Sequence, residues 1–252
     1  MTFTGKRHPA TGRAVKRAAR WLAAALAAAL VCLAATRELA RARGFQLFGR
    51  LVDRVDTTEP LVALTFDDGP TAAPLERVLG DLAARQVAAT FFVTGAELEA
   101  NPEAGRRLVA AGHELGNHTY SHARMVLRSP GFIRRQVEQT DALIRAAGQR
   151  GEIHFRPPYG YKLVGLPWYL AQTGRTTVIW DVEPDSFPQV AATAPGIVAH
   201  VVERVRPGSI ILLHVWYENR QTSRDAVPPL IDALRARGYR FVTVSQLLRS
   251  AR

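Results

Sequence analysis

The chain of 252 residues contains a single cysteine, Cys32, and two methionines. One thiol cannot form an intrachain disulfide, so the fold must be held together by its core, and cysteine use leaves the redox compartment undecided. No glycine-rich loop follows the first strand-like run at 61–66, which argues against a nucleotide-binding sheet. Hydrophobic residues make up 47% of the sequence, enough to bury the core of one large α/β domain or two small ones.

Charge is distributed unevenly along the chain. The formal net charge is +11, but residues 1–43 hold nine Lys and Arg side chains against one acid, Glu38. The remaining residues hold 24 bases and 21 acids and are close to neutral. Because a nucleic-acid-binding domain needs a basic face, we predict no nucleic-acid partner.

Residues 1–43 form a basic leader with an apolar segment at 21–35, and residues 44–60 form a connector. This order resembles the n-region and h-region of a secretory signal. The apolar segment is shorter than the roughly 20 residues of a spanning helix, and three arginines follow it. We expect export or membrane anchoring in the cell envelope, on the extracytoplasmic side, with a retained anchor slightly favoured over a cleaved signal. The alternatives are the cytoplasmic membrane surface and an amphipathic or disordered cytoplasmic leader.

Strand-like and helix-like runs alternate through one domain at 61–252. The predicted strands are 61–66, 89–94, 113–116, 152–156, 176–180, 209–213 and 240–244. The predicted helices are 74–86, 102–111, 130–147, 166–173, 194–205, 227–237 and 245–249. Seven alternations indicate a mostly parallel α/β sheet with crossover helices, either open or closed into a barrel.

The first predicted strand ends in Asp67-Asp68, directly before Gly69-Pro70, which forces a turn. Sites in parallel α/β folds lie at the carboxyl ends of the strands. Two adjacent carboxylates there are costly unless a metal binds one of them and a cation keeps the other ionised. The alternative is a solvated turn without function.

His118 and His122 follow the third predicted strand, in the polar stretch 117–124, which is predicted to be a loop or the start of a helix. On one turn of helix, imidazoles four residues apart face the same way, as metal ligation needs, although such a pair alone is more often a surface accident. A carboxylate from the first strand end would complete a set of two histidines and one carboxylate. That set suits Zn²⁺ or another divalent ion in hydrolysis.

Two further strand ends carry ionisable groups. Arg156 could pair with one of the aspartates and keep it ionised as a base, or form a surface ion pair of little energy. His214 is either a proton donor or a satisfied core histidine. His154 lies within its strand and is interpreted as structural. A metal, a carboxylate base and a histidine acid are the groups needed to hydrolyse an acyl group.

With these motifs in place, residues 61–248 resemble the polysaccharide deacetylase family, the carbohydrate esterases with a NodB-type domain. The resemblance rests on five motifs in order: Thr65–Pro70, His118–His122, Arg156–Tyr159, Trp180–Phe187 and Leu213-His214. It implies a distorted, TIM-like (β/α)₇ barrel, preceded here by the hydrophobic leader helix. It also implies a divalent metal, Zn²⁺ first, with Co²⁺, Ni²⁺ or Mn²⁺ as alternatives.

The resemblance assigns the hydrolytic groups position by position. Asp67 would be the base that activates a water at the metal, and His214 the acid that protonates the leaving sugar amine. The metal ligands would be Asp68, His118 and His122.

Other positions would support these groups. Arg156 would pair with Asp67 and orient it, and the backbone N–H of Tyr159 would help hold the oxyanion. Leu213 would line the pocket for the acetyl methyl, and we expect Pro157 to contact the substrate.

The fourth motif departs from the family pattern, since Asp185-Ser186-Phe187 stands where the family has Asp-Trp. We expect Asp185 to be the carboxylate that tunes the catalytic histidine, with Asp181 and Glu183 as alternatives. Trp216 would form part of a sugar-stacking wall or pack at the rim of the site.

The predicted function is metal-dependent removal of N-acetyl groups from a cell-envelope polysaccharide of the peptidoglycan or poly-N-acetylglucosamine type. Such an enzyme is a hydrolase of carbon–nitrogen bonds other than peptide bonds. One alternative is a membrane-associated deacetylase or deformylase of a lipid-linked sugar, because the leader would hold the enzyme beside that substrate. Another is a glycan-binding module without catalysis, against which the intact set of ionisable groups argues.

Overall fold

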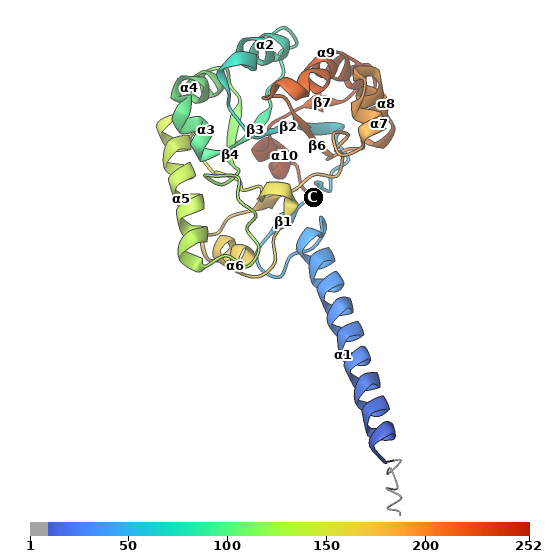
Figure 1. The fold of residues 1–252 in the computed structure, drawn as a ribbon. Coiled ribbons are helices and arrows are strands. Elements are labelled where there is room, and N and C mark those ends of the chain that lie inside the picture. Colours follow the sequence, from blue (N-terminus) through green and yellow to red (C-terminus); the bar gives the residue numbers. More distant parts are fainter. Residues whose placement is uncertain (1–9) are drawn as a thin grey trace, which may run out of the picture.

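The computed structural model describes residues 10–252, so Lys6 and Arg7 of the basic leader lie outside the described residues. Helix α1 (Ala10–Arg41) projects away from a rounded domain formed by the rest of the chain (Figure 1). Its stretch Val15–Arg41 has 27 residues, and the most apolar 18-residue window within it has a mean hydropathy of 1.9, so the helix is long and apolar enough to cross a membrane. The helix therefore extends well beyond the apolar segment on both sides, and none of its most apolar stretch is buried in the protein.

A parallel sheet in the order β4-β3-β2-β6 forms the centre of the domain, and β7 pairs with the start of β2. The strands are β2 (Leu61–Asp67), β3 (Thr90–Val93), β4 (Glu114–Asn117), β6 (Ile210–His214) and β7 (Arg240–Phe241). All seven residues of β2 are buried, as its apolar sequence predicts. The register places Asp67 beside His214 of β6.

A second, short ladder joins β1 (Leu51–Val52) to β5 (Thr177–Val178). Phe155 links it to the main sheet, because this residue bridges both Asn117 and Thr177, and Val182 bridges Ile211 on the other side. The strands thus form a ring, which confirms the predicted distorted barrel.

Two details of the barrel differ from the prediction. The strand expected at 152–156 is reduced to the bridging residue Phe155, because Pro157 and Pro158 follow it and have no N–H to donate. The connector contributes β1, and Arg54 Nη1 also donates to the carbonyl of Pro207 at 3.0 Å, so this segment packs as part of the domain.

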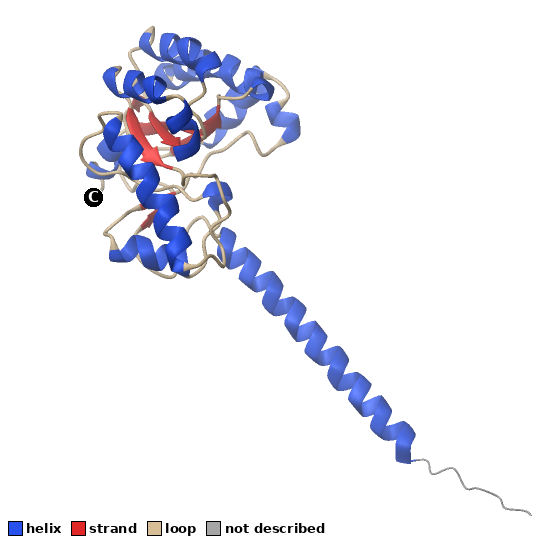
Figure 2. Ribbon diagram, turned by 60° about the vertical axis from the view of Figure 1, so that its left-hand side comes forward, coloured by secondary structure: helices blue, strands red, loops and turns tan. Residues whose placement is uncertain are grey.

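Helices surround the strands (Figure 2). Those that match the predicted runs to within a few residues are α2 (Ala72–Ala83), α4 (Pro102–Ala110), α5 (Pro130–Ala146), α6 (Gly165–Gln172), α8 (Ala194–Arg204) and α10 (Val244–Arg249). Helix α9 (Gln221–Ala236) begins earlier than predicted. The short elements α3 (Gly95–Ala100), α7 (Pro188–Ala191), η1 (Pro158–Gly160) and η2 (Glu218–Arg220) were not predicted.

Alternation along the strands decides which side chains enter the barrel. On β2, Leu64 and Phe66 pack outward into the cluster under the helices, whereas Ala63 belongs to the inner cluster. On β6, Leu213 faces outward and Leu212 inward. The same period of two directs Asp67 and His214 to the inside, at the carboxyl ends of their strands.

Candidate active site

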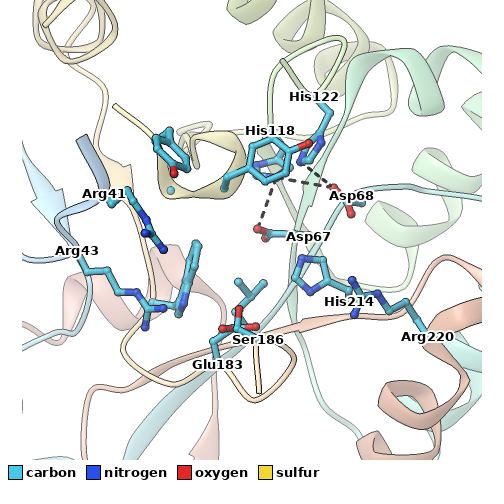
Figure 3. Close-up of a pocket in the computed structure, with 15 residues that line it drawn as sticks. Arg41, Arg43, Asp67, Asp68, His118, His122, Glu183, Ser186, His214 and Arg220 are labelled. Atoms are coloured by element: carbon cyan, nitrogen blue, oxygen red, sulfur yellow. Dashed lines mark ion pairs between the residues drawn. The ribbon is translucent and has the colours of Figure 1, made fainter. Parts of the chain in front are cut away.

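The carboxyl ends of β2, β4 and β6 open into a cavity of about 430 Å³ (Figure 3). Asp67, Asp68, His118, His122 and His214 all line it. Segments separated by up to about 150 positions in the sequence therefore meet at one place, as the strand-end argument predicts.

Asp68, His118 and His122 each offer one donor atom, and these atoms lie within 4.8 Å of one another. The Nε2 atom of His122 lies 3.3 Å from Asp68 Oδ1, and that of His118 lies 3.8 Å from the same oxygen. Two imidazole nitrogens and one carboxylate oxygen at this spacing fit a divalent ion with further positions open toward the cavity. This donor set is chemically suited to zinc and its neighbours, without selecting among them.

The two histidines do not share a helical turn, so of the two predicted alternatives, a loop or the start of a helix, the structure has the loop. Residues 118–122 form an irregular loop, in which Thr119 (φ 69°) and His122 (φ 53°) adopt left-handed conformations. The backbone N–H of His118 donates to the carbonyl of Val93 at 2.9 Å, which attaches this loop to β3. The two left-handed residues, rather than helical periodicity, bring the imidazoles together.

A hydrogen bond fixes the ring of His118. Its Nδ1 lies 2.7 Å from the carbonyl oxygen of Arg156 and must carry the proton, which leaves the Nε2 lone pair facing Asp68. Burial lowers the pKa of His118 below its ordinary value, an effect larger than the opposing attraction of Asp67. The imidazole is therefore neutral at pH 7, the form that binds metals.

Arg156 holds Asp67 from the inside of the barrel. Its side chain is fully buried, and Nη1 lies 2.6 Å from Asp67 Oδ1 and 2.8 Å from Thr65 Oγ1. The other guanidinium nitrogens donate to the carbonyls of Val178 and Ile179, and the group stacks 3.9 Å above the ring of Phe92.

This pairing decides the charge of Asp67. Burial raises the pKa of the carboxyl, but Arg156 and the nearby imidazoles lower it by more than burial raises it. The pKa of Asp67 therefore lies below its ordinary value. Asp67 is therefore ionised at neutral pH and can accept a proton, in a place where an isolated carboxylate would be protonated.

Asp185 contacts His214 on the other side of the cavity. Its Oδ2 accepts hydrogen bonds from the backbone N–H of His214 at 2.8 Å and from Nδ1 at 2.9 Å, while Oδ1 accepts from Ser223 Oγ at 2.8 Å. Burial alone lowers the pKa of His214, but the bond to Asp185 and the charge of Asp67 raise it above its ordinary value. The imidazole thus holds a proton more firmly than a free histidine does.

Neither of the two rival carboxylates, Asp181 and Glu183, accepts the hydrogen bond from the ring of His214. Asp181 accepts hydrogen bonds from Ser209 Oγ and the N–H of Ile210, both at 2.8 Å, and so closes the barrel wall. Glu183 lines the cavity near Asp185 and His214. These three residues form a second group of metal-type donors, but both oxygens of Asp185 are already engaged by hydrogen bonds.

Tyr159 and Pro157 belong to the loop that follows Arg156. Tyr159 adopts φ 59°, is 54% exposed and lines the cavity, with its ring 4.7 Å from that of His122. Pro157 is buried and does not line the cavity, contrary to the expected substrate contact. Its carbonyl accepts from the N–H of Gly160 at 2.9 Å, so it shapes the turn that presents Tyr159.

Leu213 and Trp216, two residues expected in the substrate pocket, do not line the cavity. Leu213 is fully buried in the outer cluster, and Leu212 lines the cavity in its place, because only every second residue of a strand shares the face of His214. Trp216 is 2% exposed and packs in the same cluster, 5.7 Å from the ring of Phe91, so it forms no sugar-stacking wall. It covers Gly69, where an added Cβ would lie 2.5 Å from its ring.

One wall of the cavity was not predicted. Arg41 and Arg43 line it from the end of α1, together with Tyr161 and Trp180. Trp180 stands in the fourth motif and carried a signal in the sequence, but no local pattern connects the leader with the site. Arg220, from η2, completes the rim.

The chain matches the family model for polysaccharide deacetylases over residues 54–178. A chitooligosaccharide deacetylase of Sinorhizobium fredii is 38% identical over 201 residues, which cover 79% of this chain and 88% of the relative. The model match includes the aspartate pair, both metal-site histidines and Arg156, whereas Asp185 and His214 lie beyond it.

Solved structures show the same (β/α)₇ fold. The Bc1960 peptidoglycan N-acetylglucosamine deacetylase superposes with a TM-score of 0.75 at 30% identity, over 80% of this chain and 94% of that one. A pseudoenzyme of carbohydrate esterase family 4 from Bacillus anthracis has a TM-score of 0.72 at 26% identity, over 82% of this chain and 71% of that one.

Proposed function

The chain belongs to the polysaccharide deacetylase family, and from this premise we propose that it is a metal-dependent hydrolase of N-acetylated envelope glycans. The proposed substrate is a polymer of the peptidoglycan or poly-N-acetylglucosamine type, since relatives are named for peptidoglycan and chitooligosaccharides. The convergence of Asp68, His118 and His122 within 4.8 Å, beside Asp67 and His214, is the observation that carries the proposal.

A divalent ion, Zn²⁺ first, would be held by Asp68, His118 and His122. When bound, it would polarise the acyl carbonyl and make a neighbouring water more acidic. The hydrogen bond from His118 Nδ1 to the carbonyl of Arg156 keeps the imidazole in the orientation that this task requires.

Asp67 would act as the base. Its carboxylate lines the cavity and stays ionised because Arg156 binds one of its oxygens at 2.6 Å. The other oxygen is directed toward His118, from whose Nε2 it lies 3.6 Å. It can therefore accept the proton that the attacking water gives up.

His214 would act as the acid. Asp185 engages its Nδ1, so the other ring nitrogen is left for the substrate, and the raised pKa keeps a proton available. That proton would pass to the sugar nitrogen as the carbon–nitrogen bond breaks and the new carbon–oxygen bond persists in acetate. The N–H of Tyr159 would hold the oxyanion during this exchange.

Acetate release from acetylated chito-oligosaccharide tests the proposal. We expect release by the Zn²⁺-loaded protein, loss of release with a chelator, and recovery when the metal returns. A protein that binds the oligosaccharide but releases no acetate under any metal would instead be a glycan-binding module, as the neighbouring pseudoenzyme fold allows.

Membrane association through α1 is part of the proposal, because this helix is long and apolar enough to span. It favours a second candidate substrate, a lipid-linked N-acylated sugar, which would be deacetylated or deformylated beside the membrane. Comparing acyl release from a soluble oligosaccharide and from a lipid-linked sugar separates the two candidates.

A further inference from the structure

The cavity has a basic wall that the hydrolytic reaction does not use. Arg41 is the last residue of α1 and Arg43 follows two positions later, and both line the same cavity as Asp67 and Asp68. Figure 3 shows both guanidinium groups reaching in from the side opposite Asp68 and His214. The leader is thus part of the active-site wall.

Lys162 fixes the end of α1 in this place. Its backbone N–H donates to the carbonyl of Ala40 at 2.9 Å, and its Nζ donates to the carbonyl of Ala42. Ala40 is 3% exposed and Lys162 is 1% exposed, so this junction is buried. Because Lys162 closes the loop that begins at Tyr159, the helix end and that loop are held together.

Aromatic rings orient the two arginines. The guanidinium of Arg43 lies 5.1 Å from the ring centre of Trp180, and that of Arg41 lies 5.8 Å from that of Tyr161. Stacking of this kind limits the directions a guanidinium can take while leaving its N–H edges available for hydrogen bonds.

The positive charge of this wall exceeds the negative charge that the protein places beside it. Within residues 10–252, no carboxylate lies within 4.0 Å of the guanidinium groups of Arg41, Arg43 or Arg220. Asp67 is paired with Arg156, and Asp68 belongs to the metal ligands. Glu183, the remaining carboxyl of the cavity, lies near Arg43, and one carboxyl faces the three arginines of the wall and rim. An anionic ligand group fits this imbalance.

The wall also lies close to the proposed membrane segment. The apolar segment ends at Ala35, and Arg41 lies only about 9 Å further along the helix. The connector after α1 exposes Phe45 and Leu47, and α6 exposes Trp168, whose ring contacts Phe48 at 5.1 Å. Figures 1 and 2 place α6 and the junction of α1 at the same end of the domain. Exposed aromatic and basic side chains at this end are typical of a membrane–water interface.

From this arrangement we propose that Arg41 and Arg43 form a phosphate subsite for an N-acylated sugar linked through phosphate to a membrane lipid. The subsite lies between the hydrolytic groups and the bilayer, where such a substrate carries its phosphate, between sugar and lipid. Two guanidinium groups match phosphate oxygens in geometry as well as charge. This inference rests on the proposed deacylase function and narrows its substrate class.

The test uses the full chain, Zn²⁺-loaded, in phosphatidylcholine vesicles, whose zwitterionic surface limits general attraction of anions. Three N-acetylglucosamine substrates are compared: the neutral methyl glycoside, the methyl 1-phosphodiester and the decyl 1-phosphodiester inserted in the vesicles. The variants are R41Q/R43Q and, as a matched control, R37Q, which removes an arginine of the same helix that is 63% exposed and does not line the cavity.

We expect the wild type to prefer the methyl phosphodiester to the neutral glycoside by about tenfold or more in kcat/KM, mainly through KM. The decyl phosphodiester should be a better substrate still. R41Q/R43Q should lose the preference, measured as the ratio of kcat/KM for the methyl phosphodiester to that for the neutral glycoside, whereas R37Q should keep that ratio. A preference that survives in R41Q/R43Q, or is lost equally in R37Q, would overturn the subsite.

Two further outcomes would contradict the substrate class. N-acetylmuramic acid preferred over both phosphodiesters would mean a carboxylate subsite, and no gain for the decyl phosphodiester would argue against a lipid-linked substrate. Binding of glucosamine 1-phosphate methyl ester to metal-free protein is measured in parallel. If wild type binds it at least about tenfold more tightly than R41Q/R43Q does while no substrate is deacetylated, the subsite stands and the deacylase function fails.

Discussion

Arg156 Nη1 lies 2.6 Å from Asp67 Oδ1, in a part of the barrel where the arginine is fully buried and the aspartate is 2% exposed. A buried pair of this kind gains little net energy when intact, because desolvation opposes the attraction. Its importance lies in the charge state that it imposes on the aspartate, which is the group proposed to accept the proton.

Replacing Arg156 by Met should therefore change both stability and pH dependence. Asp67 would keep its burial without its partner, at a cost of about 3–5 kcal/mol in the free energy of unfolding. In the wild type the lowered pKa keeps Asp67 ionised into the acid range. The activity of the enzyme should therefore be lost only as the pH falls through this lowered pKa. Without Arg156, burial raises this pKa, and the acid limb of kcat/KM should move to higher pH. An unchanged acid limb in a folded R156M protein would remove Arg156 from this role.

The hydrogen-bonded pair of Asp185 and His214 determines the alkaline limb of the pH–rate profile. The bond from Nδ1 to Asp185 helps to raise the pKa of His214, so the acid form persists to higher pH and is lost as the pH rises through that raised value. Asp185→Asn removes this charge, and the alkaline limb of kcat should shift to lower pH. Ser223→Ala, which keeps the carboxyl group of Asp185 and removes only one of its hydrogen-bond donors, is the matched control and should shift the limb less.

Substitution of the proposed base, Asp67, and of a proposed metal ligand, His118, should affect metal binding differently. Asp67→Asn should keep the metal, measured by elemental analysis after dialysis, and lose about 10²–10⁴-fold in kcat. His118→Ala should lose the metal, because it removes one of the three proposed ligands. If the first variant lost metal and kept turnover, the roles of Asp67 and Asp68 would be exchanged. Full metal occupancy and activity in the second would exclude His118 from the site.

The opposite faces of β6 predict different effects for adjacent leucines. Leu213→Ala should lower the free energy of unfolding by about 2–5 kcal/mol, because its side chain is fully buried in the outer cluster. Its kcat/KM per folded molecule should stay within about twofold of the wild type. Leu212→Ala should instead alter the preference between acetyl and propionyl substrates, since Leu212 lines the cavity. A changed acyl preference in L213A without destabilisation would restore the original assignment.

Much of the fold follows from local sequence patterns. The apolar run before Asp67 predicted a buried strand, and the alternation of runs predicted a parallel barrel. The pair of aspartates and both histidines could be found because each stands at a strand end. The strand expected at 152–156 failed because the two prolines after it limit backbone pairing, a local signal that was present in the sequence.

Other features depended on geometry that the sequence does not show. The imidazoles of His118 and His122 come together because Thr119 and His122 adopt the left-handed conformation in a loop. Few residues other than glycine adopt this conformation, so the sequence pattern does not predict it. Leu213 was assigned from its place in a motif, although the period of two places Leu212 on the face of His214. Arg41 and Arg43 could not be connected with the site, because the contact depends on the distant Lys162.

The two hydrogen bonds from Lys162 to the carbonyls of Ala40 and Ala42 attach the end of α1 directly to the domain, without a flexible linker. An enzyme on a flexible tether can sample a thick layer of glycan, whereas a catalytic domain attached in this way keeps a fixed height and tilt. If α1 spans the bilayer, the depth of material within reach is set by the dimensions of the domain. Inserting a glycine-serine spacer at this junction would then increase the range of distances from the bilayer that the active site can reach. It would also make the orientation of the active site relative to the bilayer more variable.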